Sequence, residues 1–268
     1  MARAQDSAAA RAEDAEDRSF VTALARGLEV LGCFRAGETA LTNQEIALRT
    51  GLPKPTVSRL THTLRRLGYL TQPVQGGAYH LGAGVLTLGY GVLAGMEIGD
   101  LAREEMRALC DGPSPHVTAA LGERHRLKMI YTAVRRSGEA VSLTLGVGAR
   151  LPLFHSAMGR AVLAGMPEGE RARLLAQAIA EKPQDEAAIR AGLDEALESY
   201  ARHGFCTSFG GWRHEINGIA VPIASLGDDR LYGLNVGGPS FLVSPEMLIG
   251  DYGARLLAAG RALDRRRA

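Results

Sequence analysis

The chain has 268 residues, 46% of them hydrophobic and 22% charged, which is long enough for two globular domains of ordinary size. It has no run of about 18 apolar residues and no apolar stretch of a secretory signal near its start, so we expect neither a membrane span nor export. The three cysteines are odd in number and lack metal-ligand spacing, which argues against a disulfide framework or a zinc site and favours the cytoplasm.

Positive charge is concentrated in the N-terminal third of the chain. Residues 18–95 contain eight Lys or Arg and three Glu, a net charge of +5, whereas the whole chain carries +2. A basic domain joined to a slightly acidic remainder is the distribution expected of a protein that contacts nucleic-acid phosphates. The preceding residues, 1–18, alternate in charge and are predicted to form a disordered tail.

The first predicted helix covers Phe20–Phe34. Leu24, Leu28 and Leu31 recur at helical spacing, and with Phe34 they predict one apolar stripe. We expect this stripe to pack beneath the elements that follow.

Residues 41–70 predict two short helices joined by a tight turn. Thr42 and Glu45 have the spacing of a capping box, in which each side chain binds the backbone of the other residue. Gly51 can adopt the left-handed conformation that ends a helix, and Pro53 sits where a second helix can begin without losing a hydrogen bond.

The second of these helices has two distinct faces. One face is apolar and is predicted to be buried: Val57, Leu60, Leu64 and Leu67. The other carries cations and small hydroxyls without any acid, as a helix in a DNA major groove would, although a solvated basic surface is the alternative. The candidate DNA contacts on this face are Lys54, Thr56, Ser58, Arg59, His62 and Arg65.

A two-stranded wing is predicted after these helices. Gly68–Thr71 leads into a strand, Gln75–Gly77 forms a turn, and Ala78–Leu81 returns. Helix, helix and wing together predict a winged helix-turn-helix domain over residues 19–82.

Residues 83–97 predict a linker helix with much apolar surface, from Val85, Leu86, Leu88, Leu93 and Met96. Such surface marks an oligomer contact or interdomain packing, and the sequence leaves both open. A dimer would suit DNA, because paired helices contact two half-sites.

Residues 98–264 predict an α/β domain around an antiparallel sheet, followed by a basic tail over 265–268. The expected strands cover 117–121, 127–133, 141–145, 205–207, 218–223 and 231–236. A helix is expected to start at His155–Ser156, where unpaired backbone amides offer a seat for a carboxylate.

Four segments resemble the IclR family of bacterial transcriptional regulators. They are RGLEVL, the run from Leu41 to Leu70, GAYHLGAGVLTLG and LPLFHSAMGRAVLA, and the resemblance extends from about Phe20 to the C-terminus. It implies a C-terminal GAF-like effector-binding domain, and it assigns Arg26 to a backbone phosphate, although an ordinary exposed arginine is as consistent with the sequence.

The resemblance also implies a small-molecule pocket between the sheet and the helix that follows His155. Its residues by position are Ala140, Leu143, His155, Ala157, Met158, Ser208, Trp212, Ile216, Gly218, Asn235 and Gly237. Ser208 stands where many members have an acid, Gly218 where many have cysteine, and Asn235 and Gly237 replace two serines. With Phe209 and Trp212 nearby, these departures suggest a small organic acid, with aromatic acids tolerated, unless the two aromatics only fill space.

The sequence therefore predicts a ligand-responsive repressor or activator of a catabolic operon. It is expected to bind double-stranded operator DNA and a small-molecule effector, to assemble as a dimer or tetramer, and to need no cofactor. One alternative is a DNA-binding regulator whose C-terminal domain only oligomerises. A remote alternative is an enzyme using His155–Ser156 or Cys206 near His203, but no motif of paired carboxylates or nucleophile and base supports it.

Overall fold

The computed structural model describes residues 19–35, 37–74, 76–94, 97–138, 143, 145–224 and 230–264. The predicted tails, the tip of the wing at Gln75, Met96 of the predicted linker helix and Ala140 lie outside these residues. The chain divides into two compact units, residues 1–95 and residues 96–268, each of which is described by itself. None of the helices in the described ranges is long and apolar enough to cross a membrane.

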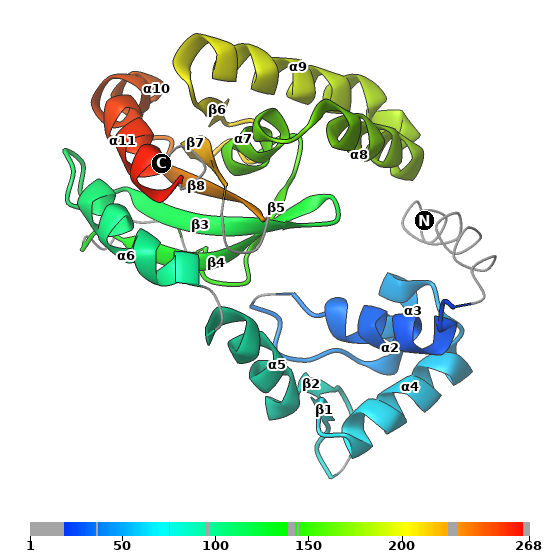
Figure 1. Ribbon diagram of the computed structural model, residues 1–268. Coiled ribbons are helices and arrows are strands. Elements are labelled where there is room, and N and C mark those ends of the chain that lie inside the picture. Colours follow the sequence, from blue (N-terminus) through cyan, green and yellow to red (C-terminus); the bar gives the residue numbers. More distant parts are fainter. Residues whose placement is uncertain are drawn as a thin grey trace. The chain divides into compact units, whose positions relative to one another are not determined.

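The N-terminal unit is a winged helix-turn-helix (Figure 1). The two strands pair antiparallel, Leu70 opposite Leu81, and a single bridge from Leu41 to Tyr79 joins the wing to the loop before the second helix. Its elements are α2 (Thr22–Gly32), α3 (Asn43–Thr50), α4 (Lys54–Arg66), β1 (Leu70–Thr71), β2 (His80–Leu81) and α5 (Ala83–Ala94).

The predicted apolar stripe of α2 is wrong in part. Val30 and Phe34 are buried, whereas Leu24 and Leu28 are exposed by 62% and 57%. At about 100° per residue, Leu28 and Val30 point about 200° apart, so only one of them can face the core. The helix turns its Val30 side inward.

The predicted apolar face of α4 is corrected at one position. Val57 and Leu64 are buried and Leu60, half-buried, packs against the same core as expected, but Leu67, at the end of the helix, is exposed. Thr61 occupies the inner face instead, because its hydroxyl can donate to the Val57 carbonyl at 3.0 Å and so be buried without losing a hydrogen bond.

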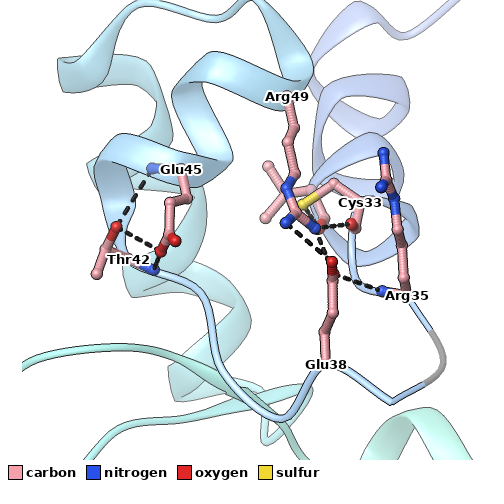
Figure 2. Close-up of polar contacts among 7 residues, drawn as sticks. Cys33, Arg35, Glu38, Thr42, Glu45 and Arg49 are labelled. Atoms are coloured by element: carbon pink, nitrogen blue, oxygen red, sulfur yellow. Dashed lines mark hydrogen bonds and ion pairs between the residues drawn. The ribbon is translucent and has the colours of Figure 1, made fainter.

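The helix-turn-helix is fixed by two polar arrangements, which Figure 2 shows. The capping box is formed: the Thr42 hydroxyl accepts from the Glu45 amide, and the Glu45 carboxylate accepts from the Thr42 amide at 2.8 Å. Beside it, Arg49 pairs with Glu38 and donates to the Cys33 carbonyl at 3.0 Å. The hydrogen bond from Arg49 holds the pKa of the Glu38 carboxyl below its usual value. Arg49 thus ties α3 to the end of α2.

The C-terminal unit is built on a six-stranded antiparallel sheet in the order β5-β4-β3-β8-β7-β6. The strands are β3 (Thr118–His125), β4 (Lys128–Arg136), β5 (Arg150–Pro152), β6 (Cys206–Phe209), β7 (Ile216–Ala224) and β8 (Leu231–Pro239). The predicted strand over 141–145 does not match: Leu143 and Leu145 lie outside any strand, and the other three residues are not described.

Helices cover both faces of this sheet, as Figure 1 shows. One core packs α6 and α11 against the sheet, and the other packs α7, α8 and α9 against the opposite face. The helices are α6 (Glu97–Cys110), α7 (Ala157–Gly165), α8 (Glu168–Glu181), α9 (Glu186–His203), α10 (Pro245–Met247) and α11 (Gly253–Leu263), with short turns at Pro183–Asp185 and Leu248–Tyr252. Successive residues of a strand point to opposite faces, so Leu121 and Leu234 enter the first core while Ala120 and Ala220 enter the second.

Replacing Thr42 with alanine is expected to destabilise the N-terminal unit by about 1 kcal/mol, because the Glu45 amide loses its capping acceptor. Native-state hydrogen exchange of the α3 amides would measure this, since the single tryptophan, Trp212, lies in the other unit. Thr42→Ser, which keeps the hydroxyl, is the control. Equal exchange rates in the two variants would contradict a stabilising capping box.

Candidate nucleic-acid interface and ligand cavity

The outer face of α4 presents the predicted DNA contacts to solvent. Because Val57, Thr61 and Leu64 turn inward, the residues between them turn outward. Thr56 is half-buried, and the exposed members of the set are Lys54, Ser58, Arg59, His62 and Arg65. The helix carries no acidic residue, so an approaching phosphate meets only cations and hydroxyls.

Arg26 has a different environment from the cations of α4. It is half-buried on α2, and its Nε atom is buried without a hydrogen-bond partner among the described residues. Its assignment to a phosphate stays a prediction, as do the contacts of the α4 residues with DNA.

The C-terminal unit contains a cavity between α7 and the sheet. The cavity is small: the volume available to the centre of a water-sized sphere is about 20 Å³, within a space of about 320 Å³ between the lining atoms that includes open solvent. The residues that line it are Tyr131, Leu143, Leu145, Leu151, Ser156, Ala157, Met158, Ser208, Trp212, Ile216, Asn217, Gly218, Asn235 and Gly237.

Nine of the eleven predicted effector residues line this cavity, although they come from separate parts of the chain. They are Leu143, Ala157, Met158, Ser208, Trp212, Ile216, Gly218, Asn235 and Gly237. Ala140 lies outside the described residues, and His155 is not among the lining residues. That these side chains bind an effector stays a prediction.

The start of α7 forms one end of the cavity. Ser156 caps the helix by accepting from the Gly159 amide at 3.1 Å. Amides in the first turn of a helix have no carbonyl four residues earlier within the helix to which they could donate. Ala157 and Met158 are in this position, and no other acceptor for their amides is found among the described residues. This end of the helix can therefore donate hydrogen bonds to an anionic group.

His155 contributes its backbone to the site. Its carbonyl accepts from the Ser208 hydroxyl at 2.6 Å, which ties the loop before α7 to β6. Burial, and after it the nearby Arg160, lowers the pKa of the His155 imidazole. The side chain is therefore neutral at neutral pH and brings no charge to a bound carboxylate.

Arg160 reinforces the same connection from inside the unit. Its guanidinium is buried, donates to the carbonyls of Thr207 at 2.8 Å and Phe154 at 3.2 Å, and pairs with Glu195 of α9. With its charge paired and its donors used within the protein, Arg160 holds the walls of the cavity in position.

The aromatic residues expected at the cavity are divided between the two faces of the sheet. Trp212 lines the cavity and stacks under Arg213, whose guanidinium carbon lies 4.8 Å from the ring centroid. Phe209 packs instead against the core on the opposite face, because the neighbouring Ser208 points toward the cavity. Of the two aromatic residues expected there, only Trp212 lines the cavity, and Tyr131, which was not expected, lines it as well.

The groups considered for catalysis are engaged in structural contacts. The Ser156 hydroxyl donates to the Pro152 carbonyl at 2.7 Å. Burial raises the pKa of the Cys206 thiol to about 12, and the thiol donates to the Ala196 carbonyl, while the His203 ring stacks on Phe205. Among the described residues, no group of three or more His, Cys, Asp or Glu could hold a metal ion.

The sequence interpretation missed five lining residues: Tyr131, Leu145, Leu151, Ser156 and Asn217. Ser156 could have been included, since it is the natural cap of the helix expected at His155. Tyr131 and Leu151 come from strands whose inward-facing side cannot be distinguished from the pattern alone, because both faces of the sheet are covered by helices.

The comparisons with known proteins agree with one another. The family model described as the IclR helix-turn-helix domain matches residues 23–73, and the model described as the bacterial transcriptional regulator IclR C-terminal matches residues 90–265. The chain is 32% identical to the transcriptional regulator TsaQ1/TsaQ2 of Comamonas testosteroni over 239 residues, which cover 88% of this chain and 85% of that protein.

Two solved structures extend the comparison. An IclR family transcriptional regulator from Brucella abortus has a TM-score of 0.82 and 46% identity, covering 92% of this chain and 93% of its own. An IclR homologue from Microbacterium hydrocarbonoxydans, solved with 4-hydroxybenzoate, has a TM-score of 0.65 and 24% identity, covering 92% of this chain and 100% of its own. The second likeness shows the shared fold.

Two paired glycines at the cavity are expected to differ in their response to an added methyl group. A Cβ at Gly237 would lie 2.4 Å from the Asn217 carbonyl oxygen, whereas one at Gly218 would meet nothing closer than 3.6 Å. Gly237→Ala should therefore lower the free energy of unfolding by about 1–3 kcal/mol and Gly218→Ala by much less. Urea unfolding followed by Trp212 fluorescence measures both, and equal decreases would contradict the described packing.

Proposed function

The chain belongs to the IclR family of bacterial transcriptional regulators, and we propose that it binds operator DNA through the outer face of α4 and responds to a small organic acid held in the cavity beneath α7. Membership of the family makes it a DNA-binding transcriptional regulator. Three points go beyond family membership: the residues that contact DNA and effector, a small organic acid as the effector, and self-association. It also assigns DNA binding to residues 19–82 and effector binding to residues 98–264.

The exposed face of α4 supports the DNA contacts. Lys54 and Arg59 supply charge for phosphates, and Ser58 and His62 supply short polar groups that can reach base edges in the major groove. The helix is held against α3 by its buried side, so these groups are presented on a rigid support.

The chemistry of the cavity supports an organic acid. The amides of Ala157 and Met158, which have no acceptor among the described residues, stand at the positive end of α7, which favours a carboxylate. Three leucines, Ile216 and Trp212 supply the apolar part of the wall, which can contact an apolar or aromatic body. The acid therefore combines one carboxylate with a compact carbon skeleton.

The apolar surface of α5 supports self-association. Leu86, Leu88, Tyr90 and Val92 are exposed by 54–73%, far more than one helix normally leaves in water. In a dimer, a second copy would cover them, and two α4 helices would meet two half-sites. An effector that binds one arrangement of the subunits more tightly than the other favours that arrangement. Operator affinity then changes by as much as the effector's affinities for the two arrangements differ.

Replacing Arg59 with alanine is expected to weaken operator binding and to reduce the dependence of log K on log salt concentration by about 0.9 for each phosphate that Arg59 neutralises. Mobility shifts at several salt concentrations measure the slope. Arg261→Ala, an exposed arginine of the C-terminal unit, is the matched control. An unchanged slope in Arg59→Ala would show that this residue does not bind a phosphate.

Small carboxylates are expected to raise the melting temperature of the C-terminal unit and to change operator affinity. The screen should include benzoate and succinate, together with 4-hydroxybenzoate, which the Microbacterium homologue binds. Gly218→Val, whose side chain would enter the cavity, should remove the response. If no acid at millimolar concentration changes the melting temperature or the operator affinity while DNA binding persists, the C-terminal unit serves only to oligomerise.

A further inference from the structure

A side-chain oxygen at the cavity lacks a hydrogen-bond partner in the part of the chain that the structure describes. Asn235 is 7% exposed, and its Oδ1 atom is buried without a partner among the described residues. Buried polar atoms in folded proteins nearly always have a partner, so an acceptor left unpaired in a cavity requires an explanation. Thr118, opposite the lining residue Gly237, has a buried hydroxyl oxygen in the same condition, but Asn235 is the one that lines the cavity.

The residues directly beside Asn235 on the sheet carry no donor. In the pairing register, Asn235 lies between Ala120 of β3 and Ala220 of β7, and the residues two positions away along β8 are Gly233 and Gly237. These neighbours are alanines and glycines without polar side chains, and the hydroxyl of Thr118, diagonal to Asn235 on the same face, has no hydrogen bond to it among the described residues. Their small size also leaves the space over Asn235 from which a ligand could reach it.

The other end of the Asn235 amide is already occupied. Its Nδ2 donates to the Tyr131 hydroxyl oxygen at 3.2 Å. Tyr131 is buried, and burial raises the pKa of its phenol to about 12, so the phenol stays neutral. With Nδ2 donating to the Tyr131 oxygen, Oδ1 is the atom of the Asn235 amide that remains available to a ligand.

We propose that Asn235 is a specificity-determining residue, whose Oδ1 accepts a hydrogen bond from a hydroxyl of the effector, so that the protein selects hydroxylated organic acids over equally large acids that lack a hydroxyl. This inference rests on the proposed function, because the carboxylate of the same ligand would bind the amides at the start of α7. An acid without a hydroxyl would fill the cavity but leave Oδ1 buried and unpaired, and sites built to bind a hydroxyl reject such analogues.

The experiment compares ligands that differ by a single group. Isothermal calorimetry with the full chain measures the affinities of 2-, 3- and 4-hydroxybenzoate against the methylbenzoates of the same substitution, and of malate against succinate. At least one hydroxylated acid is expected to bind about tenfold or more tightly than its partner. In Asn235→Leu, and in Asn235→Ala with its smaller side chain, the ratio of the two affinities should fall to near one. Thermal unfolding verifies that both variants are folded.

Ile216→Val is the matched control, because it trims an apolar wall of the same cavity. It should weaken both members of a pair alike and keep the preference for the hydroxyl. If acids bind but no pair shows a preference, or if the preference survives in both Asn235 variants, the role of Asn235 is overturned and the effector site stands. If no acid binds wild type at all, the effector site fails and this inference fails with it.

Discussion

The close approach of α7 to the sheet determines the architecture of the C-terminal unit. A Cβ at Gly122 would lie 2.6 Å from the Met158 sulfur, and one at Gly233 would lie 2.5 Å from the Met158 side chain. Glycine in the two central strands therefore lets one methionine of α7 enter the sheet surface. Gly159 repeats the constraint at the helix itself, where a Cβ would lie 2.1 Å from the Leu153 carbonyl oxygen. Larger side chains at these positions would force the helix away.

The same choice of small residues creates the cavity. Met158 fills the space over Gly122 and Gly233, but at Gly218 an added Cβ would meet no atom closer than 3.6 Å. The cavity lies here, between the start of α7 and the sheet. Arg160 and Ser208 then tie α7 and the loop before it to β6 beside the cavity.

The N-terminal unit is stabilised by a different means, because its core is small. Local polar contacts supplement that core: the capping box at Thr42 and the contacts of Arg49 with Glu38 and Cys33 fix the angle between α2 and α3 (Figure 2). All of these groups lie within a short stretch of chain. None of these contacts involves the outer face of α4, whose cations are exposed and available to a partner.

The sequence alone determined the features that depend on neighbours along the chain. The capping box, the left-handed Gly51, the turn into α4 and the wing all follow from local spacing, and the motifs were sufficient to identify the family. Only the tertiary structure decided which side of α2 faces inward, that Phe209 and Trp212 point to different faces, and that Tyr131 joins Asn235 in one cavity. The physical reason is that an apolar or small residue fits either face of a buried element. The choice between the faces comes from partners distant in sequence, which no local pattern records.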